Sequence, residues 1–105
     1  MCIFCQIVAG QAQADILHQD DLVTAFRDQH PQAPTHILIV PNEHLPSVAH
    51  LRPDMAAVAN DLARQERLAG AGYRLVVNCG AQAGQSVGHL HLPLLGGRPM
   101  RWPPG

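Results

Sequence analysis

The chain has 105 residues, 47% of them hydrophobic, which predicts a single domain over residues 1–105 with one modest core. Seven Lys and Arg against eight Asp and Glu give a formal net charge of −1, so no positive field favours a nucleic acid partner. No apolar run approaches the roughly 20 residues of a membrane span. The start, MCIFC, lacks the basic region of an export signal, and we expect a cytoplasmic protein that does not bind membranes.

The first half of the chain predicts a short helix followed by three strands. Apolar residues at helical spacing indicate a helix over residues 3–9, before Gly10. The segment ILHQDDLVTAFRD indicates two short strands joined at residues 19–21. THILIVP, residues 35–41, is β-branched and has no clean alternation, which is typical of a strand buried on both faces.

The second half predicts one long helix and two further strands. Pro53 opens the helix, with Asp54 as the expected N-cap, and glycines at 70 and 72 end it. YRLVVN from Tyr73 and SVGHLHLPLL, residues 86–95, are expected to pair as a hairpin. The order predicts an α+β fold: an antiparallel sheet of about five strands with one long helix and a short N-terminal helix, the helices on one face.

The stretch GHLHLPLLGG alternates polar and apolar residues. In a strand His89, His91 and Pro93 share one face, while the intervening leucines point to the core. Two imidazoles roughly 7 Å apart can act as a nucleophile and its neighbour, or can bind one metal ion. They can equally be two surface histidines of a half-exposed strand. The upstream loop GAQAGQS favours a phosphate site, although glycines are also common in any hairpin loop.

The segment GQSVGHLHLPLLGGR, together with AFRD, PQAPTHILIVP, PNEH, GYRLVVN and the terminal WPPG, resembles the histidine triad (HIT) family, in particular its Hint-like purine nucleoside phosphoramidase branch. The resemblance covers nearly the whole chain. It implies a HIT-like antiparallel sheet, a homodimer, and a purine nucleotide partner such as an AMP or GMP derivative. It also implies hydrolysis of purine nucleoside 5'-phosphoramidates through a nucleotidyl-histidine intermediate.

The resemblance assigns candidate residues to each part of that reaction. His91 matches the nucleophile; the His89 carbonyl matches the group that orients it, and His36 and Ser86 match its catalytic neighbours. Asp28 matches the ribose-binding carboxylate, and a carboxylate suits a vicinal diol well. The positions that match nucleotide-binding residues are Ile3, Phe4, Ile7, Phe26, Asp28, Asn78, Gly84, Gln85, Ser86 and His91. Taken from spacing alone, the four apolar ones are ordinary core positions.

Cys2 and Cys5 form a CxxC pair, and with Cys79 they make an odd number of cysteines, which argues against a disulfide framework. A redox pair normally needs a βαβ context, which is absent from this pattern. The resemblance implies a structural zinc site with Cys2, Cys5, His44 and His89 as ligands. Cys79 has no place in this scheme and is expected to be a small buried residue. Trp102 matches a C-terminal segment that approaches the partner subunit in that family.

Pro93 departs from the family pattern because it stands where the third histidine is expected. Proline has neither a side-chain donor nor a backbone N–H, so a phosphate or leaving-group contact is lost. It also removes a ladder hydrogen bond, and the strand should fray, bulge or lack a neighbour there. The sequence therefore leaves two alternatives to the hydrolase: a nucleotide-binding protein with weak or no turnover, and a zinc-stabilised scaffold in which both His89 and His91 bind metal.

Overall fold

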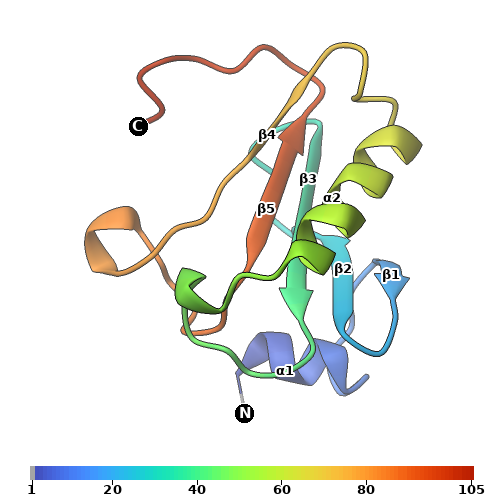
Figure 1. The fold of residues 1–105 in the computed structure, drawn as a ribbon, viewed down its shortest axis with the longest axis vertical. Coiled ribbons are helices and arrows are strands. Elements are labelled where there is room, and N and C mark those ends of the chain that lie inside the picture. The colour runs from blue at the N-terminus through green and yellow to red at the C-terminus, as the bar shows by residue number, and fades with distance from the viewer. Residues whose placement is uncertain (1) are drawn as a thin grey trace.

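Five strands form one antiparallel sheet in the order β1-β2-β3-β5-β4 in the computed structural model, which describes residues 2–105 (Figure 1). The strands are β1 (Ile16–Gln19), β2 (Val23–Arg27), β3 (Thr35–Pro41), β4 (Tyr73–Leu75) and β5 (Leu92–Gly96). The helices are α1 (Ile3–Val8) and α2 (Pro53–Gln65), and 3₁₀ turns lie at Val48–His50 and Ala81–Ala83. The predicted α+β fold, with its long helix, its short N-terminal helix and its terminal hairpin, is confirmed.

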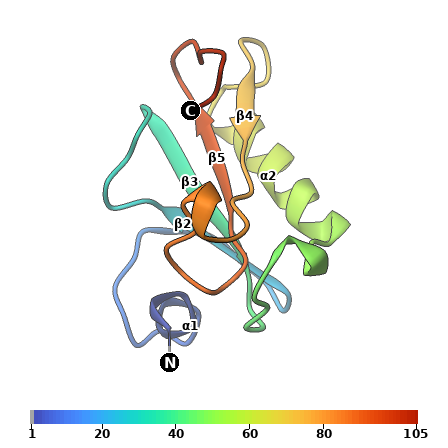
Figure 2. The same cartoon turned by 90° about the vertical axis from the view of Figure 1, so that its left-hand side faces the viewer.

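The two helices cover opposite faces of the sheet, which corrects the expectation that both lie on one face (Figure 2). Val23, Ala25, Ile37 and Ile39 pack with α2 in the larger core. The alternate residues of β2 and β3 pack with α1 in the second core, whose buried members are Phe4, Ile7, Phe26, Leu38 and Val40. Because successive side chains of a strand point to opposite faces, two strands that are buried at nearly every position need a cover on each side.

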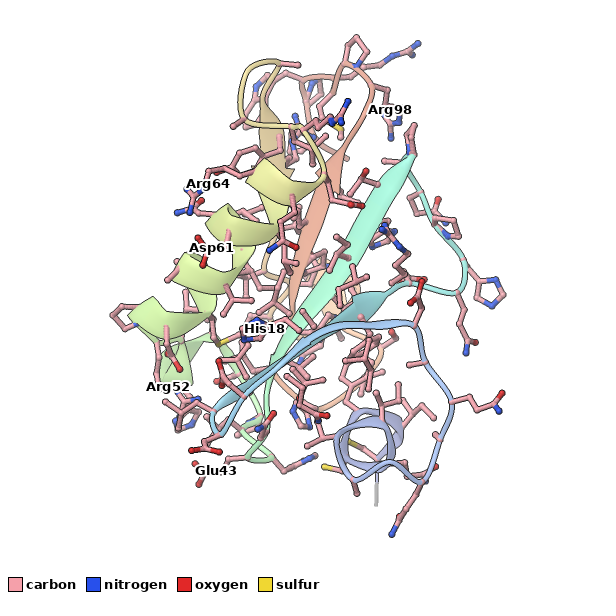
Figure 3. All side chains as sticks on the ribbon, turned by 90° about the vertical axis from the view of Figure 1, so that its right-hand side faces the viewer. His18, Glu43, Arg52, Asp61, Arg64 and Arg98 are labelled. Atoms are coloured by element: carbon pink, nitrogen blue, oxygen red, sulfur yellow. The ribbon has the colours of Figure 1, made fainter. Side chains whose placement is uncertain are left out.

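Helix α2 begins at Pro53 as expected, but its N-cap lies two residues before the predicted cap, Asp54. Arg52 occupies the N-cap and Pro53 follows at the start of the first turn, where its missing N–H costs nothing. Asp54 is therefore inside the helix and not its cap, and its Oδ1 lies 3.4 Å from Arg52 Nε. The opposite face of α2 is solvated: Asp61 and Arg64 point away from the sheet as an ion pair one turn apart (Figure 3).

Strand β5 is shorter than the predicted strand over residues 86–95, and Pro93 lies where its neighbour β4 ends. Pro93 pairs with Leu38 of β3, whereas the β4 pairing stops at Leu75 opposite Leu94. The Pro93 carbonyl still accepts a hydrogen bond from Val76 N at 3.0 Å. Since N–H and C=O of one strand residue point to the same side, the missing donor of Pro93 faces β4, and the ladder ends there.

No helix within residues 2–105 is both long and apolar enough to cross a membrane.

The turn between β1 and β2 is held by Asp20. Its Oδ1 accepts hydrogen bonds from Leu22 N and Val23 N, each at 2.8 Å, and its Oδ2 lies 2.7 Å from His18 Nε2. These bonds, that of His18 first, lower the pKa of Asp20 to about 2. A carboxyl group whose pKa falls on folding stabilises the native state above its unfolded pKa, and that contribution is lost as the pH falls through the folded pKa.

We predict that Asp20→Asn lowers the free energy of unfolding at pH 6 by less than about 1 kcal/mol, because the pair is exposed. The difference from the unmodified protein should shrink between about pH 4 and pH 2. Thermal melts across that range measure it, with the exposed neighbour Asp21→Asn as control. A destabilisation that stays constant with pH would show that the carboxylate charge is not its cause.

Candidate active site

His91 is oriented by the backbone of its own segment. Its Nδ1 lies 2.9 Å from the carbonyl oxygen of His89, and since a carbonyl only accepts, Nδ1 carries the proton. The other ring nitrogen, Nε2, is then left with a free lone pair. The half-buried ring stands edge-on to Phe4 of α1, with 5.2 Å between ring centroids. In its neutral form, the ring therefore presents Nε2 as a nucleophilic nitrogen.

A cavity of about 290 Å³ lies at His91, between the end of α1, the sheet and the loop after β4. It is lined by Phe4, Asp28, His36, Leu38, Asn78, Gly84, Ser86, Val87, His91 and Pro93. Six predicted nucleotide-binding residues are in this set, brought together from four separate parts of the chain. Leu38 and Val87 line it too, although neither carries a sequence motif that could have singled it out.

The other predicted apolar positions do not line this cavity. Ile7 and Phe26 are buried in the core between α1 and the sheet, beneath Phe4. Ile3 is exposed on the outer side of α1. Ile7 and Phe26 thus match the interpretation as ordinary core positions, whereas Ile3 is not a core residue.

Asp28 follows β2 and turns its carboxylate into the cavity. Its Oδ1 accepts a hydrogen bond from His30 N at 2.8 Å, and its Oδ2 lies 3.5 Å from His36 Nε2. Each carboxylate oxygen has a second lone pair for a further donor. The backbone contact holds the group in place while it stays available to a ligand.

His36 is held by a contact that the sequence did not indicate. The backbone N–H of Gln32 donates to its Nδ1 at 3.0 Å, so the proton of the neutral ring is on Nε2, facing Asp28. Burial lowers the pKa of His36 below its ordinary value, while the Asp28 charge opposes this shift. The loop that carries Gln32 therefore determines which nitrogen of His36 can donate.

Gln85 does not line the cavity, contrary to the expectation that it helps to surround a phosphate. Its Oε1 accepts from Gly80 N at 2.9 Å. Its Nε2 donates to the carbonyls of Pro46 and Val87, each at 3.1 Å. The Gln85 side chain thus links the two ends of the loop of residues 80–87 and joins this loop to the segment after β3. Gly84 and Ser86 of the same loop line the cavity.

Cys2, Cys5, His44 and His89 form a second cluster, which is suited to a metal ion. The six separations between the two Sγ and two Nδ1 atoms lie between 3.1 and 3.6 Å. Tetrahedral zinc, with bonds of about 2.3 Å to sulfur and about 2.0–2.1 Å to nitrogen, sets such separations at roughly 3.3–3.8 Å. The four donors therefore fit a closed tetrahedral site.

The ring of His89 is prepared for that role. It is fully buried, and its Nε2 lies 2.9 Å from the Pro41 carbonyl, which places the proton there and leaves Nδ1 as the ligand atom. Burial lowers the pKa of His89, which also favours the neutral ring that a metal requires. His91 is not among the four donors, and its Nδ1 bonds to the main-chain oxygen of His89, so the scaffold interpretation, in which both histidines bind metal, does not describe this arrangement.

Cys79 is exposed, which corrects the expectation of a buried residue. It follows the point where β4 leaves the ladder, and the chain there runs along the surface toward the loop of residues 80–87.

The HIT domain family model matches residues 9–100. The chain belongs to the HIT family. Purine nucleoside phosphoramidase of Escherichia coli K12 is 49% identical over 105 residues, covering 93% of this chain and 88% of that protein. Close relatives are thus hydrolases by name, and the family resemblance seen in the motifs is confirmed.

Solved structures of HIT proteins match the fold closely. A HIT family hydrolase from Legionella pneumophila has a TM-score of 0.94 and 44% identity, with both chains covered completely. A zinc-bound HIT protein from Mycobacterium smegmatis has a TM-score of 0.81 and 32% identity, covering 92% of this chain and 75% of that one. The HIT-like fold is therefore confirmed, and one neighbour of the same fold binds zinc.

We predict that Gln85→Ala loosens the HIT loop of residues 80–87. One net hydrogen bond contributes about 1 kcal/mol, so amide exchange at Gly80 should become roughly fivefold faster. Hydrogen exchange followed by NMR measures this rate, and the exposed Gln82→Ala in the same loop is the control. Equal exchange in both variants would mean that the Gln85 side chain does not hold the loop.

Proposed function

We propose that this HIT protein hydrolyses purine nucleoside 5'-phosphoramidates through a nucleotidyl-histidine intermediate on His91. The observation that carries the proposal is the hydrogen bond from His91 Nδ1 to the His89 carbonyl, which makes Nε2 the nitrogen with the free lone pair when the ring is neutral, beside the cavity. Nε2 attacks the α-phosphorus, the P–N bond breaks and the amine leaves. Water then attacks the same phosphorus, which releases AMP or GMP and restores the imidazole.

The groups around the cavity supply the binding half of this function. Asp28 is the acceptor for the two ribose hydroxyls, since both its oxygens have a free lone pair. Asn78, Gly84 and Ser86 lie on the phosphate side, and Phe4 offers an aromatic face for the purine. The phosphoramidase name of the E. coli relative, at 49% identity, supports this substrate class.

We also assign zinc to Cys2, Cys5, His44 and His89. Two thiolates and two imidazoles are donors that zinc accepts, and four protein ligands leave no open position, which is typical of a structural ion. When bound, the ion would join α1 to the segments before β5 and after β3. The backbone carbonyl that orients His91 belongs to one of these ligand residues, so stability at this site supports the nucleophile.

A binding protein without turnover is the second candidate, and Pro93 is the observation that favours it. Pro93 lines the cavity beside His91 but has no hydrogen to donate. The loss of a phosphate donor or of acid catalysis typically costs about 10² to 10⁴ in rate. The two candidates share the nucleotide site and differ only in turnover.

We also propose that the protein forms a homodimer through the β4 edge of its sheet. β4 is an edge strand whose outer side has no partner within residues 2–105, and Tyr73 and Leu75 on it are more than a third exposed. Unpaired, partly apolar edges favour pairing with a second chain. Trp102, 83% exposed in the C-terminal segment, is available to contact that second copy.

We predict that purified protein releases AMP from adenosine 5'-phosphoramidate and that His91→Ala lowers kcat/KM by roughly 10³-fold or more, because the nucleophile is lost. The exposed His50→Ala serves as the control and should leave the rate unchanged. If the unmodified protein releases no more AMP than His91→Ala, yet both bind AMP by calorimetry, the binding protein is the correct candidate.

We predict one zinc ion per chain by metal analysis, and its loss in Cys5→Ser or His44→Ala. His91→Ala should keep the ion, because His91 is not among the four donors and its Nδ1 bonds only to the main-chain oxygen of His89. Chelation should lower the melting temperature, since a ligand that binds only the native state stabilises it. Retention of full zinc content by Cys5→Ser would contradict the assigned ligand set.

A further inference from the structure

The cavity holds two imidazoles, His91 and His36, but no third histidine. Pro93 is buried at the third position, directly opposite Leu38 in the β3–β5 pairing. Of the remaining lining residues, Asn78 and Ser86 can donate hydrogen bonds but are not acids near neutral pH, and Asp28 is an acceptor when ionised. His36 is therefore the one lining side chain besides the nucleophile that is a candidate acid in the usual working range of pH.

The hydrogen bond from Gln32 N–H to His36 determines whether His36 can act as a protonated acid or only as a neutral hydrogen-bond donor. Its Nδ1 accepts from the backbone N–H of Gln32 at 3.0 Å. Protonation of the ring would put a second hydrogen on Nδ1, aimed at that N–H, because both nitrogens of an imidazolium are donors. His36 therefore keeps one proton, on Nε2, as long as the Gln32 contact lasts.

The groups facing His36 do not reverse this conclusion. Asp28 Oδ2 is 3.5 Å from Nε2, beyond a normal hydrogen bond, and Asp28 already accepts from His30 N. Burial of the ring lowers its pKa and so opposes the Asp28 charge. The Nε2–H group is thus left for a ligand in the cavity.

We propose that His36 acts as a neutral hydrogen-bond donor from Nε2–H to a non-bridging oxygen of the α-phosphoryl group, and that no side chain of the cavity protonates the leaving group. This rests on the proposed function. Nε2 of His91 forms the bond to phosphorus, the P–X bond breaks, and X leaves with the bonding electron pair. The proton that X takes up comes from water, while His36 keeps its own.

A substrate preference follows from this division. Without an acid, the rate depends steeply on how well X leaves by itself, so weakly basic leaving groups are favoured. Pro93 is then a specificity-determining residue: among phosphoramidates, it favours those whose leaving amine is weakly basic. A histidine at position 93 would restore a side-chain donor. Unlike His36, it would not be held neutral by the backbone N–H of Gln32.

Nitrogen NMR of uniformly labelled, unmodified protein tests the state of His36 without any turnover. We expect the neutral Nε2–H tautomer throughout pH 5.5–8, a range in which an ordinary histidine, with a pKa of about 6.5, loses its charge. We also expect a shift of the Nε2 resonance when AMP is added. An imidazolium above pH 6, or an Nδ1–H tautomer, would overturn the inference. So would an Nε2 resonance that AMP leaves unchanged.

Kinetics with anilide phosphoramidates of AMP, whose ring substituents vary the basicity of the leaving amine, test the role itself. His36→Gln keeps an N–H near the position of Nε2 and should stay within about threefold of the unmodified protein. His36→Leu should lose about 10²-fold or more in kcat/KM, as for one oxyanion donor, with an unchanged dependence on leaving-group basicity. Pro93→His should make that dependence shallower and help the most basic amine most.

The outcomes separate the two proposals. If His36→Gln fails as badly as His36→Leu, or if His36→Leu costs nothing, His36 is not a neutral donor and the inference is wrong. A steeper dependence on leaving-group basicity in His36→Leu would identify it as an acid. If no substrate shows His91-dependent release, the proposed hydrolysis fails, and the NMR response to AMP alone decides the inference.

Discussion

The buried ring and backbone of His89 connect the two sites of this protein. Nε2 is held by the Pro41 carbonyl at the end of β3, Nδ1 lies among the donors of the metal cluster, and the main-chain oxygen orients His91. A shift of this residue would therefore disturb the cluster and the orientation of His91 together. Its full burial requires that every polar atom of the ring has a partner, and the arrangement supplies one for each.

A sheet that is apolar on both faces makes this arrangement possible. One face carries α2 and the larger core, and the other carries α1, which brings Cys5 and Phe4 to the side where His89 and His91 emerge. The donors of the candidate metal cluster bring the start of α1 against His44 and His89. Helix α1 has six residues and is too short to be stable alone, so it depends on this cluster and on its apolar packing against the sheet. The face under α2 therefore carries the larger core, and the face under α1 carries both candidate sites.

Pro93 has a structural and a chemical consequence at the same position. It ends the pairing with β4 because its missing N–H would have pointed there, and the chain after Leu75 leaves the sheet toward the loop that lines the cavity. It also removes the donor that a histidine would offer. In the role proposed for His36, the Gln32 contact fixes which ring nitrogen can donate into the cavity, so that a backbone N–H in an exposed loop would bear on substrate choice.

The local patterns of the chain determined the strands, both helices and their order, because alternation, glycines and prolines act within a few residues. The same patterns placed Cys2, Cys5, His44 and His89, by resemblance, in one group that the structure does bring together. Only the tertiary structure decided that the helices lie on opposite faces, that Gln85 clips its loop, that Cys79 is exposed and that His36 is held by Gln32. Those features depend on which atoms meet across long separations in the chain, and periodicity carries no information about individual hydrogen bonds.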